Sequence, residues 1–208
     1  DRSVAFAARL MEKNINVRII DKDAVLSKHS LSRGSVAVLA MDNLNHKDLI
    51  NDIRQIATDL DISLVSIESG FGSKELPDWG GRHFLLLQKP QIAILSHADF
   101  SSYDVGVTWW SIDQYLGIRH SQVNSSMAGY ADLRRYNTIV MPSGYADLNG
   151  SKKEALMTWV AQGGTLIAHN RSSRLIASAE DFGSVKLLQN TFNTVSYTHL
   201  RAHETRNN

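Results

Sequence analysis

Residues 132–170, DLRRYNTIVMPSGYADLNGSKKEALMTWVAQGGTLIAHN, contain the pattern that decides the fold class of this chain. Two short apolar runs, TIVM at residues 138–141 and TLIA at residues 165–168, have the composition of buried strands. The sequence between them has the period of a helix. A strand, a helix and a second strand in this order form a βαβ unit, which predicts a parallel sheet covered on both faces.

The predicted helix has a start signal, an apolar face and a stop signal. Ser151 and Glu154 have the spacing of a capping box, in which each side chain accepts a hydrogen bond from a free backbone N–H. The Gly163-Gly164 pair can adopt the left-handed conformation that ends a helix. The apolar face between these signals consists of Leu156, Trp159 and Val160.

Further elements extend this unit in both directions. We expect a strand at residues 91–96 (QIAILS), a helix at 106–116, a weaker strand at 118–123, a short helix at 130–135 and more helix up to 179. Residues 91–194 are therefore predicted to be one α/β domain that is incomplete at its C-terminal end.

The first part of the chain is predicted to be a partial α/β segment over residues 1–69. The expected elements are a helix at residues 3–13, strands at 17–20 and 35–40, a helix at 46–60 capped by Asn45, and a strand at 62–67, with residues 21–32 irregular. Residues 70–90 are predicted to be a linker and boundary, because four glycines and Pro77 occur in the stretch GFGSKELPDWGG.

Composition excludes several classes of function. The chain has 208 residues, a formal net charge of +1 and no cysteine. The small charge gives no reason to expect a nucleic-acid partner. The absence of cysteine excludes disulfides, thiolate metal ligands and a cysteine nucleophile. No apolar run approaches the roughly 20 residues of a membrane-spanning helix, so no membrane span is expected.

The natural sequence is expected to be truncated at both ends of this chain. The first residue is Asp1, and a helical pattern is already under way at Ser3. Residues 195–208 have no hydrophobic period and resemble the translated read-through of a sequencing adapter, so we interpret them as a non-native tail. The tail's His199, His203 and Glu204 do not have the order of a zinc-peptidase motif, and no metal site is predicted.

Polar residues follow three of the predicted strands, at the edge where open parallel sheets bind ligands. A His-x-Asp pair can hold a metal, transfer protons or satisfy loop backbone groups. The serine does not match the Gly-x-Ser-x-Gly pattern of a nucleophile elbow, and none of the residues at 169–171 is a usual nucleophile. The candidate cleft residues are His97, Asp99, Ser143, Gly144, His169, Asn170 and Arg171.

Two adjacent tryptophans lie in the predicted helix at residues 106–116. Neighbouring side chains on a helix point about 100° apart, so Trp109 and Trp110 cannot both face the centre of the core. We expect one to pack between helix and sheet and the other to lie at a rim. An exposed tryptophan there would suit stacking against a sugar.

A set of these residues resembles a known family. The matching positions are residues 91–95 after Pro90, Gly106, Trp109-Trp110, Ile112-Asp113, Asp132-Leu133, Tyr136-Asn137, Met141-Pro142, Trp159-Val160 and residues 163–168, with residues 8–10, 17–18 and 34–35 upstream. This set resembles the C-terminal region of bacterial zinc-carboxypeptidase-like proteins of the M14 peptidase group, in which a class I glutamine-amidotransferase-like domain follows the peptidase domain.

The resemblance implies a three-layer, doubly wound, mostly parallel α/β sheet of the flavodoxin-like type. It also implies a periplasmic or secreted parent protein whose zinc is held in the peptidase domain, and no cofactor in this chain. The peptidase chemistry does not carry over, because no His-x-x-Glu pair occurs in the 208 residues. The amidotransferase chemistry does not carry over either, because its cysteine would fall near Asn170 and its oxyanion loop matches only at Ser143-Gly144.

Three functions remain open from the sequence. The leading prediction is a non-catalytic accessory domain that packs on the parent's own peptidase domain or helps to present a peptide substrate. The first alternative is a diverged α/β hydrolase that uses the polar residues at the strand ends. The second alternative is a carbohydrate-binding module with an exposed aromatic platform.

Overall fold

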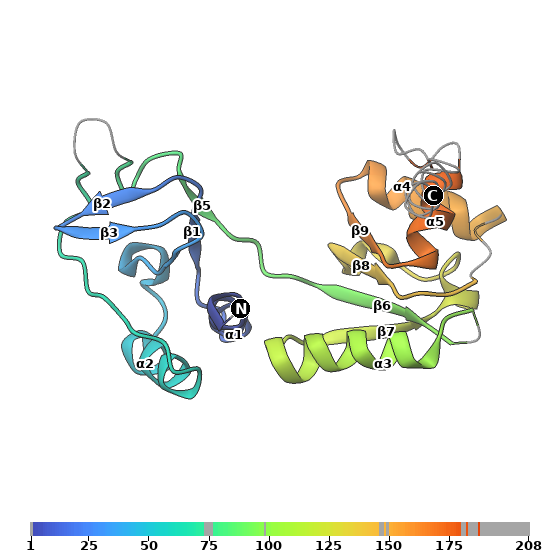
Figure 1. Cartoon of the computed structure of the whole chain (residues 1–208), viewed down its shortest axis with the longest axis horizontal. Helices are drawn as coiled ribbons and strands as arrows, with labels where there is room; N and C mark the ends of the chain where they lie inside the picture. The colour runs from blue at the N-terminus through green and yellow to red at the C-terminus, as the bar shows by residue number, and fades with distance from the viewer. Residues whose placement is uncertain are drawn as a thin grey trace, which may run out of the picture.

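A computed structural model describes residues 2–72, 77–97, 99–145, 148, 150–179, 182 and 187 of the chain. Within them, residues 2–87 (the N-terminal region) and residues 91–179 (the C-terminal region) each contain a main β-sheet, as Figure 1 shows. The tail predicted at residues 195–208 lies outside the described residues.

The C-terminal region is built on a parallel sheet of four strands, which confirms the predicted fold class. The strands are β6 (Ile92–Ser96), β7 (His120–Asn124), β8 (Thr138–Met141) and β9 (Thr165–Ala168), in the spatial order β7-β6-β8-β9. The chain therefore starts in the middle, adds β7 on one side, and then adds β8 and β9 on the other. This is the strand order of a flavodoxin-like sheet. All strands are parallel, and the direction in which successive strands are added reverses between β6 and β8.

Helices cover both faces of this sheet (Figure 1). The helical elements are α3 (Ser102–Trp110), a π-helical turn η2 (Ser111–Leu116), the 3-10 turns η3 (Ser125–Met127) and η4 (Leu133–Arg135), α4 (Gly150–Ala161) and α5 (Arg171–Ser178). On one face, Leu95 and Met141 pack against Leu156 and Trp159 of α4. On the other face, Ile94 packs in a cluster with residues of α1 and η2. Every residue of β6 is buried, as expected for a strand between two helix layers.

The unit at residues 132–170 has the predicted elements with two corrections. Helix α4 begins at Gly150, so Ser151 lies in its first turn rather than at the cap. Val160 is 36% exposed, so Leu156 and Trp159 alone form the buried face. The helix ends in a Schellman motif, because Gly163 has a φ of 99° and Gly164 donates its N–H to the Trp159 carbonyl (3.1 Å).

Among the residues that the structure describes, the cover of one sheet face is incomplete at the β9 edge. Ile167 of β9 lies on the same face as Val140 of β8, its neighbour in the register. Val140 is buried, whereas Ile167 is 41% exposed. The prediction of a sheet covered on both faces is therefore confirmed for β6 and β8, whereas the described residues leave Ile167 of β9 partly exposed on one face.

The N-terminal region holds a three-stranded antiparallel sheet, a hairpin and two helices. Its elements are α1 (Arg2–Glu12), β1 (Arg18–Ile20), β2 (Ala24–Leu26), β3 (His29–Leu31), β4 (Val36–Ala37), η1 (Ala40–Asn43), α2 (Leu49–Asp59) and β5 (Phe84–Leu86). The sheet has the order β4-β1-β5, and β2 pairs with β3. Helix α1 and strand β1 are as predicted.

Four predictions for this region are wrong. Residues 21–32 contain the β2-β3 hairpin rather than an irregular stretch. Residues 62–67, ISLVSI, form no strand. The strand expected at residues 35–40 is limited to β4, and α2 begins at Leu49 after Asp48 rather than after the expected Asn45 cap.

Helix α1 contacts both regions. Its Phe6 and Leu10 pack in one apolar cluster with Ile56 of α2, while Ala8 packs with the residues that cover the C-terminal sheet. Arg9 donates from Nη2 to the Tyr115 carbonyl at the end of η2 (3.3 Å), where a cation is favourable. The first helix of the chain therefore holds the two sheets together.

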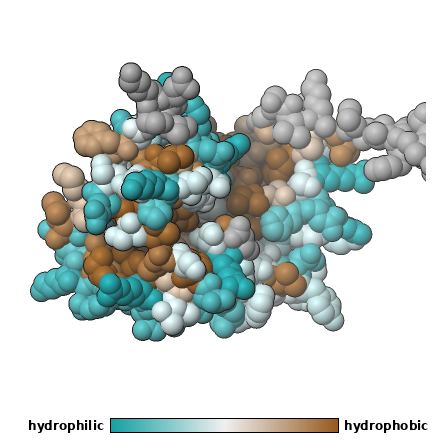
Figure 2. Space-filling view, turned by 60° about the vertical axis from the view of Figure 1, so that its left-hand side comes forward, coloured by the Kyte–Doolittle hydropathy of each residue, from teal (hydrophilic) through white to brown (hydrophobic). Residues whose placement is uncertain are grey.

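Several hydrophobic side chains of the N-terminal region are exposed, and brown surface is visible on the nearer part of the molecule in Figure 2. Met41 and Leu44, in and beside η1, are 81% and 80% exposed. The others are Val4, Val25, Ile50, Leu64, Val65, Phe71, Leu85 and Leu86. No described helix has the length and apolar character to cross a membrane.

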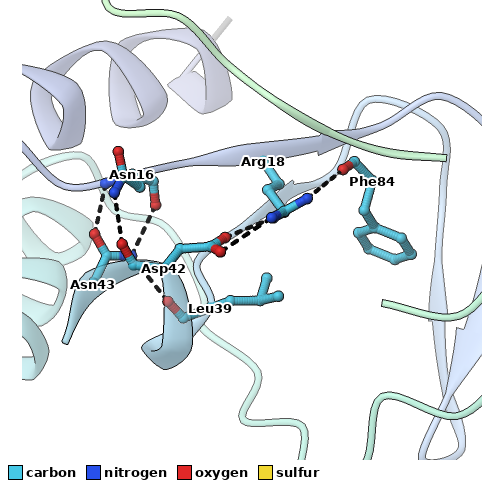
Figure 3. A network of polar contacts seen from close by, with 6 residues as sticks. All are labelled: Asn16, Arg18, Leu39, Asp42, Asn43 and Phe84. Carbon is cyan, nitrogen blue, oxygen red and sulfur yellow. Dashed lines mark hydrogen bonds and ion pairs between the residues drawn. The ribbon is translucent and has the colours of Figure 1, made fainter. Parts of the chain in front are cut away.

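A polar network fixes η1 against β1 (Figure 3). Arg18 donates from Nε and Nη2 to the two carboxylate oxygens of Asp42 (2.6 and 3.0 Å) and from Nη1 to the Phe84 carbonyl (2.9 Å). The buried Asn43 side chain accepts from the Asn16 N–H (2.7 Å) and donates to the Asn16 carbonyl (3.0 Å). The hydrogen bonds from Arg18 lower the pKa of Asp42 below its ordinary value of 3.8.

This network predicts a pH-dependent contribution to stability. Because the pKa of Asp42 is lowered on folding, its ion pair stabilises the protein above the ordinary carboxyl pKa and is lost as the pH falls through the lowered value. We expect Asp42→Asn to reduce the free energy of unfolding by about 2 kcal/mol at neutral pH and by less at about pH 3. Urea unfolding curves at both pH values measure this difference.

The exposed pair Asp132–Arg134 provides the matched control. Its side chains are 49% and 81% exposed, so Asp132→Asn should leave the free energy of unfolding almost unchanged at both pH values. A loss from Asp42→Asn that is equal at both pH values would contradict the role of the ion pair.

Candidate functional site

Two loops meet at the carboxyl ends of β6 and β8, where the strand order reverses. The Ser101 N–H donates to the Ser143 carbonyl (2.9 Å), and the Tyr145 N–H donates to the Asp99 carbonyl (2.7 Å). Phe100 and Gly144 form an isolated antiparallel bridge between the same loops. The loop that carries Asp99 and the loop that carries Ser143 and Gly144 are therefore adjacent, as the sequence predicts for strand ends at one sheet edge.

Asp99 links three elements at this edge. It accepts a hydrogen bond from Ser125 Oγ of η3 (2.5 Å) and an ion-paired hydrogen bond from Lys152 Nζ of α4 (3.4 Å). The bond from Ser125, followed by the Lys152 contacts, lowers the pKa of Asp99 despite its partial burial. A carboxylate held in this way is a weak proton acceptor, so its contacts favour a structural role over general-base catalysis.

His97 lies in the turn directly after β6. Its φ of 78° is unusual for a residue with a side chain, and its side chain is exposed. A hydrogen bond joins His97 Nδ1 to Ser96 Oγ (2.8 Å), and the His97 carbonyl accepts from the Phe100 N–H (2.9 Å). The ring is thus fixed through Nδ1, which leaves Nε2 available to a partner outside the turn.

Asn170 forms a sharp turn between β9 and α5. Its φ of 49° and ψ of −114° are strained for any residue other than glycine. The preceding His169 donates its N–H to the Met141 carbonyl (3.0 Å), which keeps the end of β9 beside β8. A strained strand-to-helix turn is the geometry in which α/β hydrolases present a nucleophile, but the side chain here is an amide.

The residues after Asn170 bind the loop that follows β8. The Ser172 hydroxyl is buried and donates to the Pro142 carbonyl (2.5 Å). The Arg171 guanidinium lies over the ring of Tyr145, 4.3 Å from its centroid. These contacts bring Ser143, Gly144 and the residues at 169–171 to one edge of the sheet, as predicted.

Several residues of the site have no signal in the sequence. Ser125, Lys152 and Tyr145 reach it from η3, α4 and the loop after β8, and no local pattern marks them as partners of Asp99 or Arg171. The tryptophan prediction is also corrected, because neither ring is buried: Trp109 is 36% exposed and Trp110 is 56% exposed.

An open depression of about 640 Å³ lies beside the end of β6, next to α3 and β7. Of the seven candidate cleft residues, only His97 lines it. The lining residues are Ser96, His97, Phe100, Ser102, Val105, Gly106, Trp109 and Gln122.

The described contacts pair no two of His97, Asp99, Ser143 and His169 through their side chains, because His97 contacts Ser96 and Asp99 contacts Ser125 and Lys152. Over the same described residues, no group of three or more His, Cys, Asp or Glu side chains could hold a metal ion. No family model, curated protein or solved structure matches this chain.

Proposed function

We propose that this chain is a non-catalytic accessory domain of a zinc-metallocarboxypeptidase-like protein. In this role it packs on the peptidase domain of the same protein or helps to present a peptide substrate. The observation that carries the proposal is the strand-to-helix turn at residue 170, which has the backbone of a nucleophile site and an asparagine side chain.

The contacts of the other candidates support this role. Asp99 is bound by Ser125 and Lys152, and the Ser172 hydroxyl is bound to the Pro142 carbonyl. Groups engaged in such contacts hold loops in place and are not free to activate a nucleophile. The contacts of these residues therefore support a structural role, rather than a catalytic role, for this edge of the sheet.

The exposed hydrophobic side chains of the N-terminal region support a partner domain. Met41 and Leu44 are about four-fifths exposed, and Leu85 and Leu86 of β5 are also exposed. Large apolar side chains gathered on one region are typical of surfaces that another domain or protein covers. The peptidase domain is the partner that the proposal assigns to them.

The alternative of a diverged hydrolase receives less support. It requires two of His97, Asp99, Ser143 and His169 within about 3.2 Å of each other, so that one can activate the other. The described hydrogen bonds connect the side chains of His97 and Asp99 to other residues instead. Asp99, the only carboxylate among them, has a lowered pKa.

Activity assays on the purified chain test the proposal. We expect no release of C-terminal residues from peptides and no hydrolysis of amide or ester substrates, with or without added zinc. A known zinc carboxypeptidase serves as the positive control. Turnover by this chain that is lost in both Asn170→Ala and His97→Ala would establish the hydrolase alternative and refute the proposal.

The parent protein is tested separately by the DNA that flanks the coding segment. The proposal predicts an upstream peptidase domain with a His-x-x-Glu zinc-binding pair. An upstream domain of another class would refute the assignment to a metallocarboxypeptidase-like protein, even if this chain is inactive.

A further inference from the structure

The open depression beside β6 is lined by one face of helix α3 and by residues of strands β6 and β7. Ser102, Val105, Gly106 and Trp109 are spaced i, i+3, i+4 and i+7, so they share one face of α3. Gln122 of β7 pairs with Ile94 of β6, so both point to the sheet face that α3 covers. The depression is therefore the space between this helix face, the carboxyl end of β6 and the middle of β7.

Gly106 leaves this space open. It lies in the interior of α3, where glycine is less favourable to a helix than alanine. A Cβ at this position would meet no heavy atom within 4 Å, so close packing does not require glycine here. Its effect is to leave the middle of the helix face without a side chain, beside the ring of Trp109.

The lining combines one aromatic face with neutral polar groups. Trp109 is 36% exposed, and Phe100, 8% exposed, contributes a buried apolar surface. Hydrogen-bonding groups come from Ser102, Gln122 and His97, while the buried Ser96 hydroxyl is bonded to His97. Apart from the histidine, no lining residue has an ionisable side chain.

We propose that this depression binds a neutral sugar ring. A pyranose has an apolar C–H face that can stack on Trp109, and hydroxyl groups that can bond to Gln122 and Ser102. The hydroxyls of its outer face stay hydrated, which suits an open site. A phosphate or carboxylate ligand would find no lysine or arginine in the lining, and a nucleobase would find only one exposed aromatic face.

This site goes beyond the accessory role and does not rest on it. Sugar binding could coexist with packing on a peptidase domain, because the depression lies in the C-terminal region and Met41 and Leu44 lie in the N-terminal region. Failure of one proposal leaves the other unchanged.

Titration of the purified chain with methyl β-D-glucopyranoside and methyl N-acetyl-β-D-glucosaminide tests the proposal. NMR signals of the Trp109 indole N–H and the Gln122 side-chain amide report the contacts. We expect both signals to shift with at least one of the sugars, with a Kd of about 1 mM, as for a small ligand in an open site.

Three variants and a matched control identify the site. Trp109→Ala should weaken binding about tenfold or more, Gln122→Ala should weaken it several-fold, and Gly106→Leu should abolish it by filling the space. Trp110→Ala is the control, because Trp110 is adjacent and more exposed but does not line the depression. Gly106→Leu adds a good helix former, so its free energy of unfolding should not fall.

Three results would refute the proposal. One is the absence of shifts at both signals with either sugar at concentrations well above the expected Kd. A second is tighter binding of adenosine or inorganic phosphate, used as probes of the competing ligand classes. Equal losses in Trp109→Ala and Trp110→Ala would also refute it, because they would indicate stacking on the helix surface rather than in the depression.

Discussion

Gly144→Ala is expected to lower the free energy of unfolding by about 3 kcal/mol or more. A Cβ at Gly144 would overlap the Asp99 carbonyl oxygen and lie 2.7 Å from Phe100 Cδ1 and 2.8 Å from Phe100 Cα. Two of these contacts are with backbone atoms, which cannot turn away as a flexible side chain can. The substitution would force apart the two loops that the Tyr145 and Ser101 hydrogen bonds join.

Urea unfolding measures this loss, and Gly106→Ala is its control. Gly106 has open space around its Cβ position, so alanine there should raise the free energy of unfolding by about 0.5–1 kcal/mol. A cost below about 1 kcal/mol for Gly144→Ala would contradict the close approach of the two loops at the sheet edge.

Strong local patterns made most of the C-terminal region predictable. The runs QIAILS and TIVM are buried strands because their length and apolar composition suit a sheet between two helix layers, whereas TLIA forms the partly exposed strand at the sheet edge. The predicted helix end at Gly163-Gly164 is confirmed, and both positions require glycine. Gly163 has a φ of 99°, and a side chain at Gly164 would collide with the Trp159 indole. Each of these signals lies within a few consecutive residues, so it can be recognised from the sequence alone.

The N-terminal region was harder to predict because its structure depends on distant pairing. The turn of the β2-β3 hairpin uses Ser27 and Lys28 at φ values of 45° and 71°, where Asn-Gly is the usual signal. Residues 62–67 have the composition of a strand, but no strand of the described sheets pairs with them. Leu64 and Val65 are exposed there.

The candidate site was predictable in position but not in its contacts. Topology brings the residues after β6, β8 and β9 to one edge of a parallel sheet, so His97, Asp99, Ser143 and Asn170 could be chosen from the sequence. What each of them binds depends on side chains from other elements. Asp99 is bound by Ser125 of η3 and Lys152 of α4, which are distant in the sequence. Its contacts could therefore not be predicted from the sequence.

Asn170→Cys is expected to produce a thiol with a pKa about one unit or more below the ordinary value of about 8.5. The residue precedes α5, whose first N–H groups favour a negative charge, and Arg171 follows it directly. The chain has no natural cysteine, so the new thiol is the only one that can react. Ser178→Cys is the matched control, because Ser178 is exposed at the opposite end of the same helix.

We propose that residue 170 stands at a nucleophile position and that its asparagine makes the site inert. The rate of alkylation by iodoacetamide, measured against pH for Asn170→Cys and Ser178→Cys, tests it most directly. We expect a lowered thiol pKa at position 170, an unchanged or raised thiol pKa at position 178, and no amide or ester hydrolysis by the unsubstituted chain. Equal thiol pKa values at the two positions, or hydrolysis by the chain with Asn170 in place, would contradict it.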